Sequence, residues 1–279
     1  AIVAVCCLAH YADLPPSQIV PLLADSGEYL ASESTFYRIL KKNKMQNHRS
    51  NTKPRKSNKP KPLIADKPNK IWSWDVTYLP ANVKGMFFYL YLIMDIYSRK
   101  IVGWEVFEKE SMEYSSELIE ASCLFEGVTK DSLTLHSDNG AIMKGITMLA
   151  KLQELGVAAS FSRPSVSNDN PYSESLFGTM KYCPQYPQKP FESIDAAREW
   201  VKSFVDGYNC QHLHSSINFV TPEDRHNGFD GNILLNRRRI YEKARMKHPE
   251  RWSGKTRNWD PVQEVLLNPL KEKEKDSIM

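Results

Sequence analysis

The clearest strand pattern in the chain begins near Ile71. In WSWDVTYL, residues 72–79, aromatic or apolar residues alternate with polar ones, which is the period of a half-buried β-strand. Residues 86–97, MFFYLYLIMDIY, are apolar almost throughout, which indicates a strand buried on both faces. The dipeptide Ser98-Arg99 then makes a tight turn into KIVGWEVF. The pattern predicts three consecutive strands joined by short connections.

Helical and strand patterns alternate after these three strands. Gly156 ends one predicted helix, and Asn170 with Pro171 opens the next one as its N-cap and first residue. Consecutive strands followed by alternating units predict an α/β fold with a mixed five-stranded sheet flanked by helices. The predicted helices cover residues 111–125, 141–155, 171–182 and 193–209, and the predicted strands among them cover 131–138 and 157–162.

Residues 1–45 predict a separate, small all-α module. Ser17 is the expected cap of one helix, Gly27 ends that helix, and a second helix opens at Ser32. A glycine-containing turn followed by a helix with basic residues is typical of a DNA-binding helix-turn-helix, and equally of a plain helical hairpin. The basic residues of the second helix are Arg38, Lys41 and Lys42.

Charge adds information where the hydrophobic pattern is weak. The net charge is only +4, yet Lys41 to Lys61 holds nine Lys or Arg and no acid. Four prolines lie in residues 46–69, so this segment is predicted to be an extended basic linker that includes Arg55 and Lys56. Such a block either binds along a polyanion or is a solvent-exposed linker.

A second basic cluster lies in residues 227–279, the predicted helical C-terminal extension. It runs from Arg237 to Arg257 and begins with three consecutive arginines, Arg237, Arg238 and Arg239. Like the first block, this cluster indicates either a polyanionic partner or a solvated segment. The predicted core domain lies between the two blocks, at residues 70–226.

Cysteine usage and hydropathy exclude several classes of protein. The five cysteines are odd in number and contain no C-x-x-C pair, so a secreted disulfide framework is not expected. Cys210, His212 and His214 lie together, but no fourth zinc ligand is evident nearby. No apolar run approaches the roughly 18 residues of a membrane span, and the AIVAVCCLA start reads as truncated, without a signal peptide. The sequence predicts a cytoplasmic protein.

Three acids stand out by their place in this pattern. Asp75 lies within the first strand, Asp138 lies just beyond the fourth, and Glu174 lies in the first turns of a helix. Each has an ordinary explanation, because strand aspartates pair with arginines, Asp-Asn-Gly is a common turn, and a first-turn glutamate favours the helix dipole. Together they form a carboxylate set that suits Mg²⁺. Two such ions can hold the attacking and leaving oxygens of a phosphoryl transfer.

The spacing of these acids carries a family resemblance. Sixty-two residues separate Asp75 from Asp138, 35 separate Asp138 from Glu174, and Lys181 follows Glu174 by seven. This resembles the D,D(35)E signature of transposases and retroviral integrases. WSWDVTYL, YLIMDIYSRKIVGWEV, HSDNGA, SFSRPSVSNDNPYSESLFGTMKY and YNCQHLHSSINFVTPED also resemble the second-frame transposase protein of two-reading-frame insertion sequences, insertion sequence family three.

The resemblance implies a fold, a chemistry and a set of partners. It implies a ribonuclease-H-like core, an N-terminal helix-turn-helix, and two Mg²⁺ bound by Asp75, Asp138 and Glu174, with Mn²⁺ as a substitute. The implied reaction is cleavage at the ends of an insertion sequence followed by DNA strand transfer. The implied partners are double-stranded DNA (terminal inverted repeats and target), a second copy of the chain, and an upstream-frame protein, all at the bacterial nucleoid.

The resemblance also implies residues that contact DNA. Lys181 is expected to contact a phosphate near the element end. Both basic blocks are expected to contact DNA phosphates, which gives salt-dependent and largely sequence-independent affinity. Asn209 and His214 retain a family segment of the form YN-x-x-R-x-H-S, whereas His212 stands where relatives often carry Arg. Two other functions remain open on the same fold, a nuclease that hydrolyses DNA without joining it and a DNA-binding protein without catalysis.

The alternation of the first strand bears on the acid site. It places Trp72 and Trp74 on one face, and Ser73 and Asp75 on the other. Asp75 is therefore expected to border a groove shared with the other two acids. Without metal, at least one of the three should have a raised pKa. His136 is expected to pack on the opposite face of its strand rather than to act in catalysis.

Overall fold

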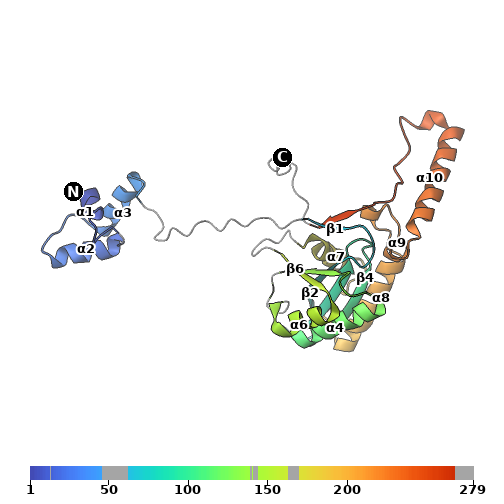
Figure 1. Cartoon of the computed structure of the whole chain (residues 1–279), viewed down its shortest axis with the longest axis horizontal. Coiled ribbons are helices and arrows are strands. Elements are labelled where there is room, and N and C mark those ends of the chain that lie inside the picture. The colour runs from blue at the N-terminus through green and yellow to red at the C-terminus, as the bar shows by residue number, and fades with distance from the viewer. Residues whose placement is uncertain (13, 46–61, 139, 141–143, 163–169, 268–279) are drawn as a thin grey trace. The chain divides into compact units, whose positions relative to one another are not determined.

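The computed structural model divides the chain into two compact units, Ala1–Asn58 and Lys59–Met279. Each unit has its own buried hydrophobic cluster. No helix within the described ranges is both long and apolar enough to cross a membrane. The structure (Figure 1) describes residues 1–12, 14–45, 62–138, 140, 144–162 and 170–267.

Three helices build the N-terminal unit. They are α1 Ile2–Cys6, α2 Pro16–Asp25 and α3 Glu33–Lys42. The predicted cap at Ser17 is wrong by two residues: Pro15 is the N-cap and Pro16 the first helical residue, since the fixed φ of proline suits a first turn. The side chains that form the core of this unit come from all three helices and include Cys6, Ile19, Leu23, Phe36 and Leu40.

Five strands form one mixed sheet in the second unit. They are β2 Ile71–Pro80, β3 Phe87–Asp95, β4 Ile101–Phe107, β5 Thr134–Ser137 and β6 Ala158–Phe161. Their order is β4-β3-β2-β5-β6, with β2, β3 and β4 antiparallel, β5 parallel to β2, and β6 parallel to β5. The predicted mixed five-stranded sheet is confirmed, and three hairpin-linked strands followed by two crossover strands form the ribonuclease-H-like arrangement.

Helices cover both faces of this sheet (Figure 1). On one face, α4 Met112–Phe125 and α6 Ile146–Leu155 pack against the two tryptophans of β2. On the other face, α7 Pro171–Lys181 and α8 Ile194–Cys210 pack against the apolar side chains of β3 and β4. The predicted alternation of β2 therefore sends its polar residues toward α7.

The C-terminal extension returns to the sheet. Strand β1 Leu63–Ala65 pairs antiparallel with β7 Val265–Leu267, and both strands pack on Ile71 and Ile96. Because β1 lies within residues 46–69, the predicted linker is wrong at its C-terminal end. The remaining elements are η2 Ser215–Ile217, α9 Pro222–His226, α10 Asp230–Lys247 and η3 Pro249–Arg251.

Gly103 tests the contact between the sheet and α4. A Cβ built on Gly103 of β4 would lie 3.1 Å from Ser122 Cβ and 3.3 Å from Ile93 Cδ1, closer than side chains normally pack. We expect Gly103→Ala to lower the free energy of unfolding by about 1–3 kcal/mol through overpacking. Equilibrium unfolding in urea measures the change.

Gly207→Ala on α8 is the matched control. A Cβ there meets nothing within 4 Å, so the same substitution should leave stability unchanged or raise it by up to about 1 kcal/mol through helix propensity. An equal loss of stability in both variants would contradict the packing of β4 on α4.

Candidate active site

The alternation of β2 decides where Asp75 points. Trp74 is buried on the side of α4 and α6, so its neighbours Ser73 and Asp75 face the other side. The Ser73 hydroxyl donates to Asn170 Oδ1 at 2.5 Å, which joins this face of β2 to the start of α7. Asp75 is half-buried, and its Oδ1 accepts a hydrogen bond of 2.8 Å from the Val76 N–H.

Asp138 follows the end of β5, which lies beside β2. The parallel register pairs Trp74 with Ser137, so Asp75 and Asp138 are the next residues along two adjacent strands. Asp138 is exposed, and its Oδ1 accepts a hydrogen bond of 3.0 Å from the Gly140 N–H. A Cβ at Gly140 would lie only 2.9 Å from that oxygen, so glycine allows the carboxylate this position.

Glu174 comes from α7, whose first turn is held against β2. The Asn170 Nδ2 donates to the Trp74 carbonyl at 3.3 Å, and the hydroxyls of Ser73 and Ser173 are 2.6 Å apart. These contacts fix the start of the helix at the level of Asp75. Glu174 itself is exposed at the surface.

The pKa of Asp75 shows that the three acids act on one another. Burial raises it to about 7, against the lowering effect of the Val76 N–H, and the charges of Asp138 and Glu174 add to the rise. The prediction of a raised pKa is confirmed, although burial contributes more than the repulsion that was expected to cause it. The charges that act on Asp75 of β2 therefore come from the residue that follows β5 and from the first turn of α7.

The donor chemistry of this site fits a hard divalent cation. All three side chains offer carboxylate oxygens, and a cation would favour the charged form of Asp75. As the side chains stand, no group of three His, Cys, Asp or Glu in the described part of the chain lies close enough together to hold a metal ion. Asp75 and Asp138 each direct an oxygen to a nearby backbone N–H instead, so metal binding requires these side chains to turn.

Two family models match this part of the chain. Both describe an Integrase core domain, one over residues 65–167 and the other over residues 155–222, and together they cover more than half of the 279 residues. The chain belongs to the integrase core family.

Curated transposases are similar to this integrase core. The transposase for insertion sequence element IS904 of Lactococcus lactis subsp. lactis is 30% identical over 165 residues, which cover 57% of this chain and 62% of that protein. The transposase for insertion sequence element IS629 of Shigella sonnei is 26% identical over 171 residues, which cover 61% of this chain and 56% of that protein. The chain thus spans about three fifths of the length of these relatives.

A solved integrase structure is also similar. The HTLV-2 integrase catalytic core domain in complex with magnesium is 17% identical, with a TM-score of 0.44, over 57% of this chain and 97% of that one.

The residues predicted to contact DNA lie in several places. Lys181 ends α7, about two helical turns after Glu174 and on the same flank; it is exposed, and partial burial of its ammonium group lowers its pKa. Arg55 and Lys56 lie outside the described residues. The exposed basic residues of α3 are Arg38, Lys41 and Lys42.

Asn209 has a structural role in the integrase core. It is buried at the end of α8, and its amide contacts the backbone of one residue of β4 on both sides, accepting from the Ile101 N–H at 2.9 Å and donating to the Ile101 carbonyl at 2.9 Å. The amide is thereby turned inward and links α8 to β4, and the contact of Asn209 with DNA stays a prediction.

His214 and His212 form an aromatic cluster with Tyr208. The His212 ring stacks on Tyr208 with centroids 5.3 Å apart, and the His214 ring meets His212 edge-on at 5.7 Å. His214 is half-buried, and its Nδ1 accepts from the Ser216 N–H at 3.3 Å. His214 thus borders a cavity of the core, and its contact with DNA stays a prediction.

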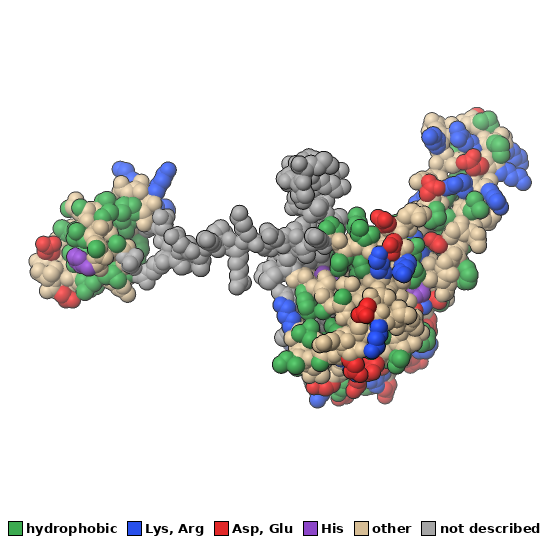
Figure 2. Space-filling view, in the orientation of Figure 1, with side chains coloured by type: hydrophobic (Ala, Val, Ile, Leu, Met, Phe, Trp, Pro, Cys, Tyr) green, Lys and Arg blue, Asp and Glu red, His purple; other side chains and the backbone are tan. Residues whose placement is uncertain are grey.

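The second basic block lies on α10, where Figure 2 shows Lys and Arg side chains gathered. The Arg237 Nη1 donates to the carbonyls of the two residues that follow η2, at 3.0 and 2.9 Å. Arg238 forms an ion pair with Asp260, and Arg239 is exposed. Arg237 and Arg238 therefore hold the C-terminal extension together, which the sequence pattern of three arginines did not indicate.

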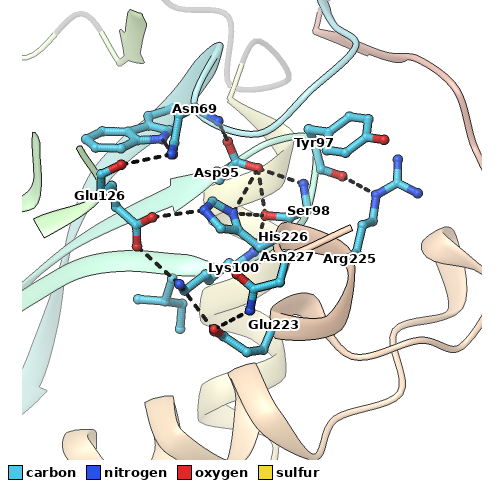
Figure 3. Close-up of polar contacts among 12 residues, drawn as sticks. Asn69, Asp95, Tyr97, Ser98, Lys100, Glu126, Glu223, Arg225, His226 and Asn227 are labelled. Carbon is cyan, nitrogen blue, oxygen red and sulfur yellow. Dashed lines mark hydrogen bonds and ion pairs between the residues drawn. The ribbon is translucent and has the colours of Figure 1, made fainter. Parts of the chain in front are cut away.

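A buried polar network behind the site was not predicted (Figure 3). Asp95, buried at the end of β3, accepts from the Ser98 hydroxyl at 2.6 Å and from the Ser98 N–H at 2.7 Å. His226 of α9 contacts Ser98 and Glu126, each at 2.9 Å. The network fixes the turn between β3 and β4. The position of Asp95 at the end of a buried strand could have indicated a buried polar network. The other members of the network, such as Glu126 and His226, are distant in sequence, so the pattern did not reveal them.

Without a divalent cation, Asp75 should make stability depend on pH. Its pKa rises from 3.8 to about 7 on folding, so the folded chain binds the proton more tightly than the unfolded chain. The stabilisation that protonated Asp75 gives to the folded chain is present in full below about pH 4 and is lost as the pH rises through about 7. At 1.36 kcal/mol per pKa unit, this stabilisation amounts to at most about 4 kcal/mol.

Asp75→Asn isolates this effect, because Asn imitates the protonated acid. In EDTA, urea unfolding should give equal stability for wild type and variant near pH 4, and a more stable variant near pH 7.5. Asp138→Asn removes an exposed acid and should keep most of the wild-type pH dependence. Identical pH profiles for wild type and Asp75→Asn would rule out the raised pKa.

Proposed function

We propose that the chain is a DDE transposase, a polynucleotidyl transferase that cleaves DNA at the ends of an insertion sequence and joins it to target DNA. The observation that carries the proposal is the convergence of three acids in an integrase core, seen in the raised pKa of Asp75 beside Asp138 and Glu174. Bringing like charges to a partly buried point opposes folding, and such groups cluster at functional sites. Similarity to the IS904 and IS629 transposases supports an insertion sequence as the substrate.

Asp75, Asp138 and Glu174 would hold two Mg²⁺, for which Mn²⁺ would substitute. When bound, the ions would activate the attacking water or 3′-hydroxyl and stabilise the leaving 3′-oxygen. Asp75 lies on a central strand, and it would release its proton as the site fills. Asp138 and Glu174 are exposed and are free to turn toward Asp75.

Several basic side chains would place the DNA. Lys181, on the Glu174 flank of α7, would contact a phosphate near the cleaved bond. Helix α3, with Arg38, Lys41 and Lys42 exposed, would enter a major groove at the terminal inverted repeat. Arg55, Lys56 and Arg239 would follow the backbone without reading sequence.

The reaction would require an assembly. Two element ends have to be brought together, so a second copy of the chain is the expected partner, with target DNA as the acceptor. An upstream-frame protein of the same element is a further proposed partner. The proposed setting is the bacterial cytoplasm, at the nucleoid.

Glu174→Gln tests the catalytic assignment. The amide keeps the shape of the side chain and loses the charge that a metal ligand requires, so cleavage and strand transfer should fall by about 10³-fold or more. DNA affinity should stay close to that of the wild type. Duplexes carrying the DNA that flanks the gene, incubated with Mg²⁺, Mn²⁺ or EDTA, give the measurement. Glu199→Gln, an exposed position on α8, is the matched control and should retain activity.

Two outcomes would favour the other functions. Pre-cut ends that are hydrolysed further but never joined would indicate a nuclease. A wild-type chain that binds the terminal repeat and neither cleaves nor joins it with either metal would indicate a DNA-binding protein without catalysis.

A further inference from the structure

Arg99 has an unusual backbone conformation in the turn between β3 and β4. Its φ is +71°, in the left-handed region that favours glycine, and the residue is only 7% exposed. The polar network around Asp95 holds the turn, and the Arg99 N–H donates to the Asp95 carbonyl at 2.8 Å. Non-glycine residues strained in this way gather at functional sites.

The Arg99 guanidinium lacks the acceptors that a buried cation requires. Within the part of the chain that the structure describes, its Nε and Nη1 are buried and have no hydrogen-bond partner. Its Cζ lies 4.1 Å from the centroid of the Tyr172 ring. Buried charges in native proteins are paired or bound to a ligand, so these two donors point to an acceptor from outside the chain.

Arg225 shows how the same chain treats a buried arginine with a structural role (Figure 3). It is 1% exposed and lies 4.0 Å from the Tyr97 ring, as Arg99 does from Tyr172. Its Nε donates to the Tyr97 carbonyl at 2.8 Å, its Nη2 donates to the Val262 carbonyl at 2.7 Å, and its Nη1 pairs with an aspartate at 3.4 Å. Arg99 has the aromatic contact without these acceptors.

A cavity of about 360 Å³ opens beside Arg99. Its lining, as far as the structure describes it, contains no Asp or Glu. Burial, and then the charges of Arg99 and His212, lower the pKa of His214 to about 4, so its imidazole is neutral at pH 7. The polar residues that line the cavity with Arg99 are Tyr172, Ser175, Thr179, Tyr208, His214, Ser215 and Ser216. One cation surrounded by neutral polar groups suits a single anion.

The cavity lies on the flank of α7 away from the acids. At 3.6 residues per turn, the residues of α7 that line the cavity share one flank, and Glu174 and Lys181 share another. Leu176 lies where the cavity flank meets the core, and Met180 faces the core. A helix with its side chains is about 10–12 Å across. Phosphates on one strand of B-DNA are about 3.4 Å apart along the axis. A DNA strand that crosses the width of α7 would therefore bring to Arg99 a phosphate about three nucleotides from the one at the acids.

We propose that this cavity binds one backbone phosphate of the DNA, through the forked guanidinium of Arg99 and the hydroxyls of Ser175 and Ser216. The proposal rests on the proposed function, because it takes DNA as the substrate. A guanidinium presents two parallel donors to a phosphate, and the Tyr172 ring supports its plane. The contact would set the position of the strand relative to the three acids.

Inorganic phosphate tests the cavity without DNA. At constant ionic strength, with chloride as the reference anion, phosphate should raise the Tm of the wild-type chain and leave the Tm of Arg99→Gln unchanged. Lys202→Gln removes an exposed cation on α8, paired with Asp206, and should keep the wild-type response. Because Arg99→Gln removes an unpaired buried charge, it is expected to fold.

Ser175→Glu is a second variant that keeps Arg99. It supplies a carboxylate from an exposed position in the lining, so it should raise the Tm in chloride and abolish the response to phosphate. A wild-type chain whose Tm does not respond to phosphate, or an Arg99→Gln chain that responds as the wild type does, would overturn the proposal.

The salt dependence of DNA affinity tests whether the phosphate belongs to DNA. Arg99→Gln should weaken duplex binding by about tenfold and reduce the slope of log K against log [NaCl] by about one. Arg99→Lys should keep the slope and lose part of the affinity, because a point charge lacks the fork. Lys202→Gln should match the wild type.

The two measurements separate the possible sources of phosphate. A response to inorganic phosphate combined with an unchanged DNA slope would show a site for free phosphate and overturn the proposal. Both measurements report binding, so a chain that binds DNA through Arg99 and fails to cleave it contradicts only the proposed function. A chain that binds no duplex at all contradicts both, even where the phosphate response shows that the cavity takes an anion.

Discussion

The attachment of α7 to β2 is the contact on which the site depends. Ser73, Asn170 and Ser173 are buried and satisfy one another, and Asn170 also donates to the Trp74 carbonyl. Buried polar groups of this kind tolerate little displacement, because a broken hydrogen bond would leave a desolvated donor or acceptor. The same contacts hold the acid-bearing flank of α7 over β2 and its other flank over the Arg99 cavity.

Two charges of opposite sign, those of Asp75 and Arg99, lie near the two flanks of α7 without full compensation. Asp75 is half-buried near two other acids, and Arg99 is buried without acceptors among the described residues. Each lowers the stability of the free chain, and each would be relieved by a ligand of the opposite charge. Bound metal cations would compensate the negative charge of Asp75, and a phosphate of the DNA strand would compensate the positive charge of Arg99. The complex with metal and DNA would therefore leave fewer uncompensated charges than the ligand-free chain has.

Local pattern was enough to predict the sheet and the acids. Period-two alternation in β2, a continuous apolar run in β3, and the Asn170-Pro171 start of α7 are properties of short segments. What was missed depends on pairs far apart in sequence. The strand β1 is three residues long and acquires its partner from β7, and the inward role of Asn209 depends on a peptide of β4. Arg99 looked like an ordinary turn residue, since its burial and lack of acceptors appear only after α7 and η2 pack around it.

The register of the β1–β7 pair has a mechanical consequence. Leu63 lies opposite Leu267, so the chain that precedes β1 and the chain that follows β7 both leave from the same end of a two-stranded ribbon. A force that pulls the chain before Leu63 away from the chain after Leu267 would unzip the ribbon. Its hydrogen bonds would break one after another rather than all together, as they would in shear. The Tyr172 hydroxyl donates to the Leu266 carbonyl at 2.7 Å, so the first turn of α7 is fastened to this ribbon. A load at these ends would therefore reach the helix that carries Glu174 through Tyr172, as well as the sheet through Ile71.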